Sequence, residues 1–154
     1  MNSVQFVIPG DPPRTTAQEK AVRVVNGKPI FYEPNRLKQA RAQLMKGLSM
    51  HRPKEVLEGA VYLEVCWMFR PGKSHVDGTW KTTRPDTDNL EKLLKDCMTR
   101  TGFWHDDAQV VCEVVMKRWS KYPGIRIRAE RIEDNDELWR VVQAGTIGSE
   151  VGQG

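Results

Sequence analysis

The stretch Arg84-Pro-Asp-Thr-Asp-Asn-Leu-Glu-Lys92 carries two aspartates two positions apart, and a second acidic pair, Asp106-Asp107, follows it along the chain. Alternate residues of an extended segment face the same side, so the carboxylates of Asp86 and Asp88 can address one ion. A hard cation such as Mg²⁺ takes oxygen ligands and keeps several waters. We therefore expect a carboxylate-held metal ion here. One carboxylate of the Asp106-Asp107 pair would face the ion, and the other would support it.

The residues between the two acidic pairs have the periodicity of a helix. Its apolar face comprises Leu90, Leu93, Leu94, Cys97 and Met98. We expect a helix from Asn89 to Arg100, with Asp88 as its N-cap and Gly102 as its stop. Asp88 then shares a face with Lys92, which would hold an ammonium beside the ion without making it a ligand. Lys92 is a candidate for stabilising the transition state or the leaving group of phosphodiester hydrolysis.

The rest of the chain predicts an α+β domain with a small mixed or antiparallel sheet and two main helices. Strands are expected at Val4–Ile8, Ala21–Val25, Lys28–Tyr32, Gly59–Arg70, Val110–Trp119 and Ile125–Ile132, and the other main helix at Asn35–Met50. Asn26-Gly27 between two apolar runs indicates a hairpin, because a type I′ turn needs positive φ at both central positions. We expect residues 1–133 to form the domain, and residues 134–154 to form a short helix ending near Val142 and a flexible tail.

Composition limits the class of protein. With 154 residues, 39% hydrophobic and 29% charged, the chain is large enough for one domain with a real core, and it contains no apolar run that could span a membrane. Its three cysteines, Cys66, Cys97 and Cys112, have no zinc or redox spacing, which favours a reduced, cytoplasmic setting.

A net charge of +4 around an acidic pocket favours a polyanionic partner such as DNA, although ordinary solvated charge gives the same composition. Basic side chains gather in the N-terminal segment and the predicted hairpin. These are Arg14, Lys20, Arg23 and Lys28. They make the hairpin a candidate DNA-gripping arm, and an ordinary solvated edge hairpin is the alternative.

Other carboxylate motifs do not match. Counted from Asp86, an EF-hand loop would need Gly and Glu where this chain has Glu91 and Cys97. An Asp-x-Asp phosphatase would want an apolar strand directly before Asp86, and the residues from Trp80 to Pro85 are not one. The purely structural alternative is that Asp88 is only an N-cap and that Asp106-Asp107 are only turn residues.

The stretch from Arg84 to Lys92, then Asp96 and Gly102-Phe-Trp-His-Asp-Asp-Ala-Gln-Val-Val111, resembles the RusA family of Holliday junction resolvases. The resemblance implies a RusA-like fold and a homodimeric endonuclease that needs Mg²⁺, with Mn²⁺ as an alternative ion. Such an enzyme resolves four-way DNA junctions by paired symmetric nicks. It is often encoded by bacteriophages and prophages, and it acts in the bacterial cytoplasm.

The resemblance also implies roles for individual residues. The family's essential acids fall on Asp86, Asp88 and Asp107, which would bind the metal, and its catalytic lysine falls on Lys92. Asp106 lies beside these acids and is expected to take part in catalysis with them. Arg84 and Asn89 belong to the same motif and are expected at the DNA. Two alternatives stay open: a metal-dependent nuclease acting on flaps or other branched DNA, and a protein that binds junctions without cutting them.

Overall fold

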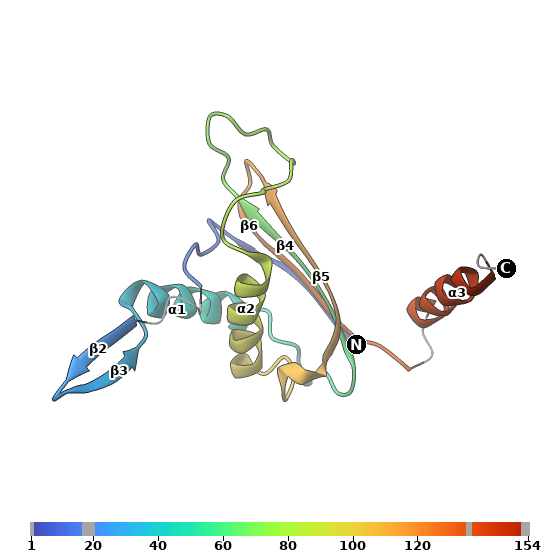
Figure 1. Ribbon diagram of the computed structural model, residues 1–154, viewed down its shortest axis with the longest axis horizontal. Coiled ribbons are helices and arrows are strands. Elements are labelled where there is room, and N and C mark those ends of the chain that lie inside the picture. Colours follow the sequence, from blue (N-terminus) through green and yellow to red (C-terminus); the bar gives the residue numbers. More distant parts are fainter. Residues whose placement is uncertain (1, 17–20, 135–136, 152–154) are drawn as a thin grey trace.

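The computed structural model describes residues 2–16, 21–134 and 137–151 (Figure 1). The strands are β1 (Ser3–Pro9), β2 (Ala21–Val25), β3 (Lys28–Tyr32), β4 (Val61–Phe69), β5 (Val110–Trp119) and β6 (Gly124–Arg131). The helices are α1 (Asn35–Ser49), α2 (Thr87–Thr101), a short 3₁₀ turn η1 (Asp107–Gln109) and α3 (Glu137–Val151).

The main sheet has four strands in the order β1-β6-β4-β5. β6 pairs antiparallel with both β1 and β4, whereas β4 and β5 are parallel, so the sheet is mixed. A parallel pair needs a long crossover, and here α2 lies in that crossover. Figure 1 shows α1 and α2 on the same side of the sheet and the β2–β3 hairpin projecting away from it. The predicted α+β class is confirmed.

The core lies between the sheet and the two helices. Its fully buried helical side chains are Leu37, Leu44 and Leu48 of α1 and Leu90, Leu93, Leu94, Cys97 and Met98 of α2. β4 contributes alternate buried residues, among them Trp67 and Phe69, as expected for a central strand. Each large apolar side chain contributes about 1.5–3 kcal/mol through burial. This packing holds the apolar face of α2 against the sheet.

One carboxyl group lies inside this core. Glu91 is only 2% exposed, and its Oε1 accepts a hydrogen bond of 2.8 Å from Nε1 of Trp67. Its other oxygen has no hydrogen-bond partner among the described residues. Burial raises the pKa of Glu91 to about 7, although the Trp67 hydrogen bond acts in the opposite direction. The side chain therefore takes up a proton close to neutral pH.

The helix ends show where the sequence predictions need correction. α2 begins at Thr87, so Asp86 and not Asp88 is the N-cap residue, and no side-chain hydrogen bond caps the helix there. Asp88 instead lies in the first turn, where its negative charge complements the helix dipole. Gly102, with φ of 84°, ends α2 in the left-handed conformation, as predicted.

The predicted hairpin turn is confirmed, since Asn26 and Gly27 have φ of 52° and 76°. The C-terminal helix extends further than expected, because α3 continues to Val151 and not only to about Val142. Glycines within this segment weaken a helix by about 1 kcal/mol each but do not break it as a proline would.

Glu91→Gln should remove a pH dependence of folding stability. The ordinary carboxyl pKa is 4.5 and the folded value is about 7, so between these values the folded state holds a proton that the unfolded state has lost. Wild-type stability should therefore be full below pH 4.5 and fall by at most about 1.4 kcal/mol per pH unit as the pH rises toward 7. Gln keeps an acceptor for Trp67 and does not titrate. Urea denaturation at several pH values measures the effect, with the exposed Glu55→Gln as control. The prediction would be contradicted if the free energy of unfolding changed with pH in the same way for wild type and Glu91→Gln.

Candidate active site

The N-terminal end of α2 presents the first acidic pair. Asp86 and Asp88 are both exposed, at the helix start and in its first turn. The segment before Asp86 is held to the sheet by Lys117 of β5. The Lys117 ammonium donates to the backbone oxygens of Thr83, at 2.8 Å, and of Pro85, at 2.7 Å. Lys117 is therefore a positioning residue for Asp86, and no local sequence pattern indicates this role.

Lys92 lies on α2 one turn beyond Asp88, and both side chains are exposed. Because α2 includes both residues, their spacing of four positions puts them on the same face. The prediction that Asp88 and Lys92 lie on one helix agrees with the bounds of α2. Of the two predicted DNA contacts in this motif, Arg84 is exposed and Asn89 is partly exposed.

The second acidic pair lies beyond the C-terminal end of α2, and its two members have different roles. Asp106 is the N-cap of η1, and its Oδ1 accepts from the backbone N–H of Ala108 at 2.8 Å. Asp107 is the first residue of η1 and is exposed. Within the described part of the chain its carboxylate makes no hydrogen bond or ion pair. Asp107 is thus available to a ligand, while Asp106 shapes the turn.

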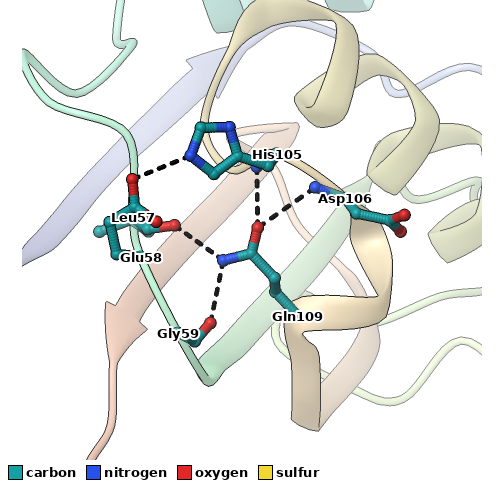
Figure 2. Close-up of polar contacts among 6 residues, drawn as sticks. All are labelled: Leu57, Glu58, Gly59, His105, Asp106 and Gln109. Atoms are coloured by element: carbon teal, nitrogen blue, oxygen red, sulfur yellow. Dashed lines mark hydrogen bonds and ion pairs between the residues drawn. The ribbon is translucent and has the colours of Figure 1, made fainter.

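Figure 2 shows how Gln109 fixes this turn. Its side-chain oxygen accepts from the backbone N–H of His105 at 2.8 Å and of Asp106 at 3.2 Å. Its side-chain nitrogen donates to the backbone oxygens of Leu57 and Gly59, each at 2.9 Å. One side chain therefore ties η1 to the segment that enters β4. The signal available in the sequence was the Asp-x-x-Gln spacing of a capping box.

The two acidic pairs do not meet within one chain. α2 has fifteen residues, which corresponds to about 22 Å. β5 confirms the separation, because it starts beside η1 at Val110 and reaches the other end of α2 at Lys117, a span of about 23 Å. The same arrangement is visible in Figure 1, where α2 and β5 run side by side.

Among the described residues, no group of three or more His, Cys, Asp or Glu side chains is placed to hold a metal ion. The expectation of one ion faced by both pairs is therefore not met within a single chain. The physical reason is the rigid helix between them. A single chain therefore cannot bind one ion with carboxylates from both acidic pairs.

The remaining predicted DNA-binding residues lie apart from α2. Arg14 is exposed on the segment that follows β1. Arg23 and Lys28 are exposed on the β2–β3 hairpin, which projects from the body of the molecule (Figure 1). Lys20 falls outside the described residues.

Comparison with known proteins identifies the family. The model of the family named Endodeoxyribonuclease RusA matches residues 9–130, which include both acidic pairs and the positioning residues Gln109 and Lys117. The chain belongs to the RusA family. It is a member of a family of endodeoxyribonucleases, and the resemblance seen in the motif from Arg84 to Val111 is confirmed.

Individual relatives agree with this family. A crossover junction endodeoxyribonuclease of Lactococcus phage r1t is 37% identical over 123 residues, covering 77% of this chain and 86% of the relative. The uncharacterized protein YqaN of Bacillus subtilis is 27% identical over 144 residues, covering 86% of this chain and 99% of the relative. The crossover junction endodeoxyribonuclease RusA of Escherichia coli K12 is 56% identical over 34 residues, which is 22% of this chain and 28% of the relative.

None of the helices in the described ranges is both long enough and apolar enough to cross a lipid bilayer.

Gln109→Ala should lower both stability and DNA cleavage. The change removes the four hydrogen bonds that hold η1, and leaving backbone groups unpaired costs about 1–3 kcal/mol. A displaced Asp107 should slow cleavage of branched DNA by at least about tenfold. Urea denaturation and single-turnover cleavage measure the two effects. His105→Ala is the matched control, because it removes only the exposed contact with Glu58. A cleavage rate like that of the wild type in Gln109→Ala would show that this turn does not position the site.

Lys117→Met should slow cleavage through Asp86. The variant keeps the apolar stem but loses the two hydrogen bonds to the carbonyls before the helix, so the segment carrying Asp86 becomes free to move. We expect at least about a tenfold loss in single-turnover rate, since a displacement of 1 Å can cost about a hundredfold. Lys121→Met makes the same chemical change at an exposed side chain beyond β5. An equal loss of cleavage rate in both variants would mean that the missing positive charge, and not the missing hydrogen bond to Pro85, slows cleavage.

Proposed function

We propose that this protein is a structure-specific endonuclease that resolves four-way DNA junctions by paired nicks, and that each of its two sites is completed by a second copy of the chain. The observation that carries this proposal is the separation of the acidic pairs by the length of α2 in a family of endodeoxyribonucleases. Each chain offers two half-sites, one at either end of the same helix.

A two-fold axis provides a simple solution to this separation. If two α2 helices lie antiparallel, the end that carries Asp86 and Asp88 in one copy faces the end that carries Asp107 in the other. The same axis generates the second site at once. Two sites related by a two-fold axis match a junction that must be nicked in two strands at symmetric points.

The free edge of the sheet offers a surface for this pairing. β5 is the edge strand, and its C-terminal part is already covered, because Lys81 N–H donates to the Lys117 oxygen and Trp119 N–H to the Thr79 oxygen. In the described structure, β5 makes no such contact between Cys112 and Met116. Antiparallel pairing of two copies along this stretch would place η1 of one copy near Lys117 of the other. An unpaired edge strand of this kind is a template for another strand.

The completed site would use three carboxylates for Mg²⁺ or Mn²⁺, from Asp86 and Asp88 of one copy and from Asp107 of the other. A bound ion of this kind supplies positive charge at the phosphate and a water that ionises more readily. The chain itself contributes Lys92. Its ammonium, one turn from Asp88, would stabilise the charge that develops on the phosphate or the leaving oxygen.

The basic side chains would bind the rest of the DNA. Arg84 and Asn89 flank the acidic pair at the start of α2, so they would contact the cleaved strand. The hairpin carries Lys28 and also Arg23, which lies over the Tyr32 ring at 5.6 Å. A projecting ribbon of this kind could reach a second duplex arm. These contacts would act in the cytoplasm of a bacterial cell, where phage DNA recombines.

Incubation with labelled DNA tests the proposal. The substrates are a four-way junction, a flap and a linear duplex, each with Mg²⁺, Mn²⁺ or EDTA. Paired nicks in the junction alone support the proposal. Equal cleavage of the flap would assign a broader branched-DNA nuclease, and binding without nicking would assign a junction-binding protein.

Mixing two inactive variants should restore nicking. Asp88→Asn and Asp107→Asn each damage both sites of a homodimer, so each variant alone should lose cleavage and keep junction binding. In a mixed dimer, one site carries both changes and the other carries neither. An equimolar mixture, refolded together, should recover roughly a quarter of wild-type nicking, given that about half of the dimers are mixed and each has one intact site.

The products of this mixture are informative as well. The mixed dimer should nick one strand of the junction and leave the symmetric strand intact. Asp86→Asn mixed with Asp88→Asn provides the control, because both changes fall in the same half-site at the start of α2 and no mixed dimer would then contain an intact site. Continued inactivity of the equimolar mixture, with mixed dimers verified by mass spectrometry, would show that each site lies within one chain.

A further inference from the structure

A pocket near the C-terminal ends of β4 and β5 lies outside the proposed site. It is lined by Arg14, Arg70, His75 and Trp119, together with Asp11 and the backbone near Pro71. Its single carboxylate, on Asp11, lies 3.4 Å from Nε of Arg70. The His75 ring stacks on Trp119 with 3.9 Å between centroids, and its Nδ1 accepts from the backbone N–H of Gly72. That acceptor role leaves the second ring nitrogen of His75 as a potential donor.

Behind Trp119 lies a lysine in an unusual environment. Lys81 is only 4% exposed, and its ammonium lies 4.4 Å from the centroid of the Trp119 ring and 5.2 Å from that of Phe69. It donates a hydrogen bond to the hydroxyl of Thr83. None of the carboxylates in the described ranges pairs with it. Burial lowers the pKa of Lys81, and the positive charges of Lys117 and Arg14 lower it further.

This arrangement leaves the region short of negative charge. A buried ammonium without a counter-ion is unfavourable, and contacts with ring faces contribute only about 0.5–2 kcal/mol. Three other cations, Arg14, Arg70 and Lys117, surround or neighbour the same residues, and the single carboxylate of the pocket already contacts Arg70. An anion bound in this pocket would relieve the repulsion among them.

From this geometry we infer that the pocket binds a backbone phosphate of the DNA, with Arg14 as the direct contact and Lys81 as a buried charge that strengthens the positive potential. The inference rests on the proposed function, and it adds a second anchoring point to the site at α2. The two are neighbours, because Lys81 and Lys117 both hold Thr83, which lies three residues before Asp86. The pocket therefore binds a phosphate on the strand that enters at the N-terminal end of α2.

Salt-dependent binding of a fluorescent four-way junction, measured by anisotropy in EDTA, tests the inference. Each phosphate contact contributes about −0.9 to the slope of log K against log salt concentration. Arg14→Gln should make the slope less negative by about 0.9, and Lys81→Met should also reduce it. Lys54→Gln removes one charge at an exposed residue near the opposite end of the sheet, and its slope should equal that of the wild type.

Thermal unfolding separates a binding role of Lys81 from a structural one. Methionine fills the same space without a charge, so Lys81→Met should unfold at the wild-type temperature or above it. A lower unfolding temperature with an unchanged slope would show that Lys81 serves only packing, and an unchanged slope in Arg14→Gln would overturn the inference by itself.

Two further outcomes show whether the proposed function or the phosphate site is wrong. If wild-type protein does not bind the junction, the proposed function fails first, and the phosphate site fails with it. If the variants keep the wild-type slope but lose saturable binding of inorganic phosphate measured by calorimetry, the pocket serves a free anion, which also overturns the assignment to DNA.

Discussion

The packing of the α2 apolar face into the core against the sheet is the constraint on which the arrangement of the site depends. Five apolar side chains of the helix are fully buried, and Glu91 adds a hydrogen bond to Trp67 in the same interface. A helix fixed in this way cannot bend to bring its ends together. The core therefore determines the positions of both acidic pairs. Any catalytic site that uses both pairs must accommodate the distance between them.

Both ends of the helix are held by side chains that bond to backbone groups. Lys117 binds carbonyls before Asp86, and Gln109 binds carbonyls before β4 while accepting from the turn that carries Asp107. These bonds connect the acidic segments to the two ends of β5, the strand that Lys117 belongs to and that Gln109 directly precedes. The sheet edge thus sets the position of both half-sites, which makes β5 the natural reference for any assembly of two copies.

Much of the fold could be predicted from local patterns. The Asn26-Gly27 turn, the stop at Gly102 and the apolar face of α2 each depend on neighbouring residues only, and each was predicted correctly. The start of α2 was misplaced because both Asp86 and Asp88 are acceptable N-cap residues, and the sequence does not say which one leaves the helix. The roles of Gln109 and Lys117 depend on segments far away in the sequence, such as Leu57 and Pro85, so no local pattern could reveal them.

The family motif predicted the type of chemistry more accurately than the positions of the acidic residues. Spacing alone led to the expectation that four acids gather around one ion, since a sequence motif contains no information on whether two ends of a helix belong to the same site. The spacing alone did not say which of Asp106 and Asp107 supports the other, because the role of Asp106 depends on the hydrogen bond that it accepts from the backbone of Ala108. Separation of the acids within each chain has a consequence for the cell. If each site is completed by a second copy, as proposed, a single molecule would lack a complete site. Cleavage would then rise with the square of the protein concentration, as long as that concentration lies well below the dimer dissociation constant.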